Sequence, residues 1–273
     1  MRELSGKVAV VTGAASGIGR ALALRFAAEG MTLMLADVDP GGLAETAYQA
    51  GDGKVLTQVT DVSDAAAVRH LANRCFGEFG AVHVLCNNAG VFQGGRMWTR
   101  GEEDFAWLLG VNLWGVLHGI HEFVPRMIEQ DTEGHIVNTV SVAGLFTSPG
   151  SGGYAVTKYA AMAASQALAE DLAATGSKLR VTALCPGAVR TRIADSERLR
   201  PPGLVTTPTQ DEADVQAWVG RAAQRGLDPA EVADLVVAAI REERFLVLTD
   251  PGHAARLRLQ TETLLTGNLP PYQ

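Results

Sequence analysis

A glycine-rich loop between a strand-like run and a helix-like segment is the feature that most constrains this sequence. Residues 7–12 form a short apolar run, Gly13, Gly17 and Gly19 follow it, and helical periodicity begins at Gly17. Gly13 permits a tight turn, Gly17 lets a phosphate approach the backbone, and Gly19 lets the helix pack closely. Unpaired N–H groups and the positive dipole end at a helix start favour an anion. The loop therefore predicts a dinucleotide-phosphate site, with contacts from Gly13, Ser16, Gly17, Ile18 and Gly19.

Strand-like and helix-like segments alternate along the chain. The expected strands are residues 7–12, 32–36, 55–61, 82–86, 135–141, 180–185 and 245–248. The expected helices are residues 17–29, 41–50, 65–79, 104–128, 154–174 and 229–242. Apolar strands joined by helices indicate a parallel sheet with helices on both faces. We therefore expect one α/β domain over residues 1–273, with a Rossmann-like, doubly wound parallel sheet of about seven strands.

One proline- and glycine-rich segment interrupts this alternation. Residues 190–208 are polar and are expected to form a long loop, and residues 213–224 after them have the pattern of an amphipathic helix. Together they form a flap over about residues 190–224. Long loops at the carboxyl ends of strands are often substrate lids, and the alternative is a disordered insertion.

The composition argues against several classes of partner. The formal net charge is −7, so neither a nucleic acid nor an anionic membrane is expected to bind. No apolar stretch is long enough for a membrane helix, and the N-terminus has no charged leader with a cleavage site. Cys86 and Cys185 lie in apolar runs, as expected of small core residues in a reducing compartment. We therefore expect a cytoplasmic protein.

Asp37 follows the second expected strand and bears on the choice of cofactor. A carboxylate there can accept hydrogen bonds from the 2′- and 3′-hydroxyls of an adenosine ribose, and it would repel a 2′-phosphate. This favours NAD over NADP. Arg20 lies beside the glycine loop and would offset the repulsion if it contacted a phosphate, whereas Asp39 with Pro40 has the pattern of a turn into the next helix.

The ends of the third and fourth expected strands add further polar groups. Asp61 can accept a hydrogen bond from an adenine amino group; alternatively, Asp61 or Ser63 caps the following helix. Residues 87–90 read Asn-Asn-Ala-Gly, and their amides can fix the edge of the sheet while their backbone lines a cofactor cleft. The cofactor contacts expected here are Asp61, Val62, Asn88, Ala89 and Gly90.

Tyr154 and Lys158 lie four positions apart in an expected helix, so they share one face with Cβ atoms about 5–6 Å apart. A free phenol has a pKa of about 10. A neighbouring cation favours the phenolate, so we expect Lys158 and a positively charged nicotinamide ring to lower this pKa. Tyr154 can then accept the proton of an alcohol or donate one to a carbonyl. Lys158 can also hydrogen-bond the nicotinamide ribose.

Two other polar residues are expected to act together with the tyrosine–lysine pair. Ser141 lies at the end of the fifth expected strand, where it can hydrogen-bond a substrate oxygen beside Tyr154. Asn112 is a polar residue in an apolar helical stretch. Its amide can bend that helix and hold a water that relays protons to Lys158; the alternative is a helix kink with no catalytic part.

Together these motifs resemble those of the short-chain dehydrogenase/reductase family, in its shorter branch. The matching positions, which cover about Leu4 to Arg192, are residues 12–19, Asp37, Asp61, residues 87–90, Asn112, Ser141, Tyr154, Lys158, Pro186 and Gly187. The resemblance implies a catalytic tetrad of Asn112, Ser141, Tyr154 and Lys158. It also implies cofactor contacts from Tyr154, Lys158, Pro186, Gly187, Val189 and Thr191, with Thr191 on the nicotinamide carboxamide.

The resemblance further implies a homodimer or homotetramer, built partly on the small residues of 160–169. The sequence departs from the family after residue 248, where Thr-Asp-Pro-Gly stands in place of a D-G-G motif. A helix is expected at 254–265, within a helical tail over about 252–273. This departure puts the tetramer in doubt, and the tail either makes a different contact or folds over its own active site.

The expected reaction is hydride transfer between NAD and a secondary alcohol or ketone. Substrate contacts are expected from Ser141, Tyr154, Phe92 and Leu145, and the apolar residues among them, with Val142 and Phe146, indicate a hydrophobic substrate. His118 and His121 share a helix face, but no carboxylate or cysteine completes a metal set, so no metal is expected. The alternative is an NAD-binding sensor or scaffold, against which the complete tetrad argues.

Overall fold

A parallel sheet lies at the centre of the part of the chain that this computed structural model describes, residues 1–51 and 53–270. Its strands are β1 (Val8–Thr12), β2 (Thr32–Asp37), β3 (Val55–Val59), β4 (Val84–Asn87), β5 (Gly134–Thr139), β6 (Leu179–Cys185) and β7 (Leu246–Leu248). The order β3-β2-β1-β4-β5-β6-β7 reverses direction between β1 and β4. Ligands of such sheets bind at the carboxyl ends of the strands beside the reversal. The predicted Rossmann-like fold is confirmed.

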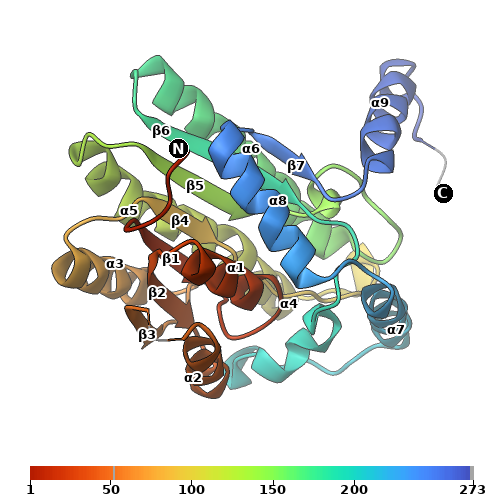
Figure 1. Cartoon of the computed structure of the whole chain (residues 1–273). Helices are drawn as coiled ribbons and strands as arrows, with labels where there is room; N and C mark the ends of the chain where they lie inside the picture. The colour runs from red at the N-terminus through yellow and green to blue at the C-terminus, as the bar shows by residue number, and fades with distance from the viewer. Residues whose placement is uncertain (52, 271–273) are drawn as a thin grey trace.

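Helices cover both faces of this sheet. They are α1 (Gly17–Ala28), α2 (Pro40–Gln49), α3 (Ala65–Phe79), α4 (Glu102–Leu109), α5 (Gly115–Glu129), α6 (Gly152–Ala174), α7 (Gln210–Gln224), α8 (Pro229–Glu242) and α9 (Gly252–Leu265). Figure 1 shows α1 and α8 side by side over one face. Val11 of β1 packs into the core on that face, whereas Val10 packs against α3 and α5 on the other. This alternation is what a strand buried on both faces requires.

Several predicted elements differ in detail. The helix expected over residues 104–128 is two helices, α4 and α5, joined by a π-helical turn at Gly110–Trp114. The flap loop is not structureless, because it contains 3₁₀ turns at Ile193–Leu199 and Pro202–Leu204 before α7. Strands β3 and β5 each end two residues earlier than expected, at Val59 and Thr139. Asp61 and Ser141 therefore lie in the connections after the strands.

The predicted tail helix is confirmed as α9, which buries none of its residues fully and stands apart from the sheet (Figure 1). The last three residues of the predicted tail, 271–273, lie outside the described residues. Cys75, Cys86 and Cys185 are buried and free, and burial raises the pKa of the Cys75 thiol to about 12. Of the helices in the described ranges, none combines the length and apolar character needed to cross a membrane.

Candidate active site

The glycine loop connects β1 to α1 as tightly as its glycines allow. Gly13 has a φ of +67°, and a Cβ there would lie 2.8 Å from the Cα of Ala89. Gly17 also has a positive φ, of +55°. A Cβ on Gly19 would overlap the carbonyl oxygen of Gly13. Neither Gly13 nor Gly19 leaves room for a side chain. The tight turn expected at Gly13 and the close packing expected at Gly19 are therefore both present.

The start of α1 has the free donors that a phosphate needs. Ser16 is the N-cap, its side chain makes no capping hydrogen bond within the described residues, and the first turn contains no acidic side chain. The first N–H groups of the helix therefore have no anionic partner from the chain. Arg20 lies beside this helix start, and its guanidinium donates to the carbonyl oxygen of Ala15 at 2.7 Å and to Thr46 Oγ1 at 3.0 Å, so two of its nitrogens hold the loop and α2 together.

Substitution of Gly19 by alanine tests this packing. We expect Gly19→Ala to lower the free energy of unfolding by about 1–3 kcal/mol or more, because the added methyl meets the backbone of the loop. Gly77 is the matched control: it lies inside α3 and has open space around it, so Gly77→Ala should leave stability unchanged or raise it by up to about 1 kcal/mol. Urea denaturation of both variants measures the difference, and equal midpoints would contradict the packing role of Gly19.

Asp37 presents its carboxylate at the end of β2. Its oxygens accept hydrogen bonds from the backbone N–H of Ala15 at 2.9 Å and of Asp39 at 3.0 Å. Burial raises the pKa of Asp37, and these hydrogen bonds offset only part of the rise. Asp39 accepts from the N–H of Gly42 as the N-cap of α2, which confirms its predicted place in the turn. Asp37 is thus held rigidly at the cleft.

The strand ends beyond β2 are held by side-chain amides and hydroxyls. Asn88 donates to the carbonyl oxygen of Thr12 at 3.0 Å and accepts from Thr139 Oγ1 at 3.0 Å, so it ties β1 and β5 to the end of β4. Asp61 accepts from the N–H and hydroxyl of Ser63. The N-cap of α3 is Asp64, so the alternative that Asp61 or Ser63 caps this helix is wrong.

Ser141, Tyr154 and Lys158 converge beside the end of β5. Lys158 is buried, its ammonium donates to the carbonyl oxygen of Thr139 at 2.9 Å, and its nitrogen lies 5.6 Å from the centre of the Tyr154 ring. Ser141 is close enough to Tyr154 to affect the pKa of its phenol, and its Oγ accepts a hydrogen bond from the N–H of Ala143 at 3.1 Å. The backbone of Ser141 has a φ of 152°, a conformation that non-glycine residues rarely adopt and that recurs at active sites.

Asn112 lies in the π-helical turn between α4 and α5 and is fully buried. Its side-chain oxygen accepts from the N–H of Val91 at 2.8 Å, and its nitrogen donates to the carbonyl oxygen of Val91 at 2.9 Å and to Thr157 Oγ1 at 3.1 Å. The predicted interruption of the helix at Asn112 is confirmed. Because Thr157 precedes Lys158 on α6, this amide links the segment after β4 to the helix that carries the lysine.

The electrostatics of Tyr154 differ from the expectation. Burial raises the pKa of the phenol to about 12, and the nearby Ser141 hydroxyl offsets only part of that rise. Burial also lowers the pKa of Lys158 to about 8. The expected lowering of the phenol's pKa by Lys158 is therefore wrong for the chain alone, since removal from water disfavours the charged form of both groups.

One cavity of about 490 Å³ joins these elements. It is lined by all the residues predicted to contact the cofactor, namely Gly13, Ser16, Gly17, Ile18, Gly19, Asp37, Asp61, Val62, Asn88, Ala89, Gly90, Tyr154, Lys158, Pro186, Gly187, Val189 and Thr191. Ser141 and Phe92 line it too, and the Phe92 ring meets the Tyr154 ring edge-on at 5.1 Å. The glycine backbone, the free helix start and the Asp37 carboxylate at the end of β2 fit a nicotinamide dinucleotide.

Two predicted site residues lie outside this lining. Asn112 is behind it, bonded to Val91 and Thr157. Leu145 was expected to touch substrate, but its side chain packs into a core cluster and its neighbour Phe146 lines the cavity instead. Leu145 follows the 3₁₀ turn Val142–Gly144, and successive side chains of such a turn point in different directions, so an error of one position moves a predicted contact from the cavity into the core.

Sequence reasoning did not identify the individual flap and tail residues that close the cavity. Ser196, Leu199, Leu204 and Trp218 of the flap line it, and so does Arg256 of α9. The guanidinium of Arg256 lies 4.5 Å from the centre of the Phe146 ring, and Gln260 donates to the carbonyl oxygen of Leu145 at 2.6 Å. The tail therefore packs against its own active site, one of the two alternatives expected. The apolar residues within the polar flap were the available signal.

No group of three or more histidine, cysteine or acidic side chains in the described chain is placed to hold a metal ion. His118 instead hydrogen-bonds the carbonyl oxygen of Val62 at 2.9 Å and stacks on Trp114.

Comparisons with known proteins place the chain among enzymes of one kind. Residues 7–201 match the family described as short chain dehydrogenase. The chain is 31% identical to a CLA biosynthesis dehydrogenase/reductase of Lactiplantibacillus plantarum, over 99% of this chain and 97% of that protein. It is 35% identical to a 1-deoxy-11-beta-hydroxypentalenate dehydrogenase of Streptomyces avermitilis, over 93% and 88% of the two chains.

A solved structure has the same fold as this chain over nearly its whole length. A short chain dehydrogenase/reductase from Burkholderia phymatum, in complex with NAD, is 43% identical, covers 99% of this chain and 98% of its own, and superposes with a TM-score of 0.97. With the sheet order, the glycine loop and the clustered tyrosine and lysine, these matches establish that the chain belongs to the short-chain dehydrogenase/reductase family of oxidoreductases.

Proposed function

We propose that this protein is an NAD-dependent oxidoreductase that interconverts a secondary alcohol and a ketone, with Tyr154 as general acid and base. The observation that carries the proposal is the placement of Ser141, Tyr154 and Lys158 on one wall of the cavity that begins at the glycine loop. A substrate carbon at that wall would lie next to a nicotinamide bound along the loop. The NAD complex of the structural relative and the hydroxy compound named for the Streptomyces relative support this reading.

Each residue has a distinct part in the proposed reaction. Bound NAD would supply the hydride acceptor. Ser141 holds the substrate oxygen, and Tyr154 takes the hydroxyl proton as the C–H bond breaks, so an alcohol becomes a ketone. Lys158 places a cation near the phenol ring, and Asn112 fixes the segment beside it. In the reverse direction Tyr154 returns the proton to the carbonyl oxygen.

The substrate half of the cavity indicates a hydrophobic alcohol or ketone. Phe92, Trp107, Phe146, Leu204 and Trp218 line it. Apolar walls of this kind contribute about 25 cal/mol for each Å² of apolar surface removed from water. We further propose that the protein acts in the cytoplasm as a homodimer or homotetramer. The small residues of α6 and its exposed Val156 and Tyr159 offer a surface for a second copy.

The test is a panel of cyclic, aromatic and aliphatic secondary alcohols with NAD⁺, followed by the absorbance of NADH. We expect turnover of bulky hydrophobic alcohols and little turnover of short polar ones. If the protein binds NADH but neither oxidises any alcohol of the panel nor reduces any matching ketone, the proposal is overturned in favour of a sensor or scaffold.

A further inference from the structure

Residues of the flap over 190–224 form part of the wall of the cavity that Tyr154 also lines. Its residues Ser196, Leu199, Leu204 and Trp218 line the substrate half. The hydroxyl of Ser196 accepts a hydrogen bond from the N–H of Phe92 at 3.0 Å. The position of the flap therefore sets the shape of the space in which a substrate meets the tyrosine.

Four charged side chains fasten this flap to the segment between β4 and α4, and we call Arg100, Asp104, Arg200 and Glu212 the clasp. Arg200 Nη2 lies 2.6 Å from Asp104 Oδ1, and Arg100 Nη1 lies 2.6 Å from Glu212 Oε2. Arg100 Nη1 is also 3.6 Å from Asp104 Oδ2. The four side chains are 2% to 6% exposed. The two shorter ion pairs each join a residue of the flap to α4 or to the residues just before it, whereas the Arg100–Asp104 pair lies within that segment.

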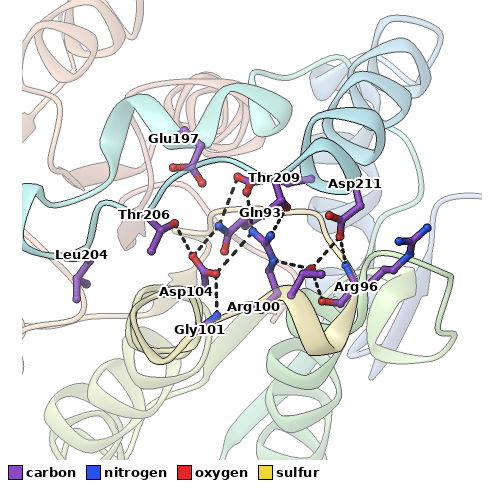
Figure 2. A network of polar contacts seen from close by, with 12 residues as sticks. Gln93, Arg96, Arg100, Gly101, Asp104, Glu197, Leu204, Thr206, Thr209 and Asp211 are labelled. Carbon is purple, nitrogen blue, oxygen red and sulfur yellow. Dashed lines mark hydrogen bonds and ion pairs between the residues drawn. The ribbon is translucent and has the colours of Figure 1, made fainter.

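Asp104 is the centre of the clasp. Figure 2 shows its carboxylate facing Arg100, Gln93 and Thr206, and hydrogen bonds reach it from Gln93 at 2.8 Å and from Thr206 at 3.0 Å. Arg200 continues the network, since its Nε donates to the carbonyl oxygen of Leu204 at 2.6 Å. These contacts fix two stretches of the flap, one on each side of Pro201 and Pro202.

The clasp also contacts the walls of the cavity directly. Gln93 follows Phe92, whose ring packs against Tyr154. The guanidinium of Arg200 lies 5.0 Å from the centre of the Trp107 ring, and Trp107 lines the cavity. A shift of the clasp would therefore move both the flap and the aromatic side chains that a substrate touches.

Stability alone does not account for four buried charges. Removing a charge from water costs several kcal/mol, and well-packed apolar residues of similar volume often stabilise a protein as well as a buried ion pair does. An apolar contact tolerates sliding, whereas charge-assisted hydrogen bonds are directional and hold one register. The cluster is thus suited to defining a single position of the flap.

We propose that the clasp is a positioning device that holds the flap in one register over the substrate half of the cavity and so determines substrate affinity and selectivity. The proposal rests on the proposed alcohol–ketone chemistry only for its kinetic readout. None of the four residues lines the cavity, so they act through the flap and the aromatic wall.

The test uses Asp104→Asn, Arg200→Gln and the double variant, each in the full chain. With the best alcohol of the panel, we expect KM to rise by about 10- to 100-fold, because the displaced flap loses contacts that it makes equally with substrate and transition state. The kcat and the dissociation constant of NADH, measured by its fluorescence, should change by less than about three-fold. The double variant removes both charges, so its unfolding midpoint should recover relative to the single variants while KM stays raised.

Glu122→Gln is the matched control, because Glu122 is a buried carboxylate paired with Arg69 at 3.1 Å on α3 and α5, away from the cavity. It should lower stability without changing KM. If KM in the clasp variants follows the unfolding midpoint, including its recovery in the double variant, the clasp is merely structural and the proposal is wrong.

Hydrogen–deuterium exchange separates the clasp from the proposed reaction. In Asp104→Asn we expect faster exchange confined to residues 193–224 and to the 91–101 segment, with α1 and α8 unchanged. This result supports the clasp even if no alcohol is oxidised. Unchanged exchange of the flap, or faster exchange throughout the sheet, would overturn it, whatever the enzyme's activity.

Discussion

The Tyr154→Phe variant should lose at least about 1000-fold in kcat while it binds NADH within a few-fold of the native protein. General acid–base catalysis by a positioned side chain contributes about 100- to 10,000-fold. The substitution removes the phenolic oxygen and keeps the ring that packs against Phe92 at 5.1 Å. Turnover with the best alcohol and fluorescence titration with NADH measure the two quantities. Activity retained within ten-fold would mean that another group carries the proton.

Tyr159→Phe is the matched control for this variant. Tyr159 lies on the same helix, and its hydroxyl donates to the carbonyl oxygen of Leu145 at 2.6 Å. Losing that hydrogen bond should cost about 1 kcal/mol of stability, with a change in kcat of less than about three-fold. The two variants remove the same atom from the same helix, so a difference in kcat reports the position of the hydroxyl and not the general effect of losing one.

The raised pKa of Tyr154 sharpens the interpretation of this result. At about 12 in the chain alone, the phenol is neutral at physiological pH, which suits donation of a proton to a ketone. Burial lowers the pKa of Lys158 to about 8, so its ammonium is charged below about pH 8 and neutral above it. Oxidation of an alcohol requires the phenolate, so it depends on further positive charge from the bound cofactor. A buried tyrosine without that charge would be a poor base.

The fold was predictable because its signals are local. The spacing of Gly13, Gly17 and Gly19 after an apolar run predicted a loop whose backbone geometry requires glycine at each position. The helix expected over residues 229–242 is α8 with the same bounds, since Asp228 caps it and Pro229 opens it. Parallel strands bring their carboxyl ends to one edge, so residues at predicted strand ends gather in one cavity.

The clasp could not be predicted, because its pairs depend on distant parts of the chain. Asp104 and Arg200 are 96 positions apart, and Arg100 and Glu212 are 112 apart. In the sequence each reads as a charged residue of a helix or a polar loop, and nothing in the periodicity indicates burial. The pKa of Tyr154 was misjudged for a related reason. Helical spacing identified its cationic neighbour, whereas the degree of burial depends on the flap and on Phe92.

If Asp37 sets the proposed choice of cofactor, Asp37→Ala should lower the preference for NAD over NADP by about 10- to 100-fold. A hydrogen bond to a charged group contributes about 1.5–3 kcal/mol, and each 1.4 kcal/mol is a factor of ten. The carboxylate is aimed by the N–H groups of Ala15 and Asp39, at 2.9 and 3.0 Å. The ratio of kcat/KM for the two cofactors is the measurement. An unchanged ratio would refute the assignment of NAD.

Asp39→Asn shows whether the preference comes from Asp37 itself or from the acidic character of that end of the cavity. Asp39 also lines the cavity, but its carboxylate is occupied as the N-cap of α2. Asparagine keeps the capping oxygen and removes the charge, so stability should hold. If hydrogen bonds from the ribose to Asp37 decide the choice, Asp39→Asn leaves the ratio within about three-fold. If repulsion of a 2′-phosphate by the local field decides it, both variants shift the ratio, because screening at this short range is weak.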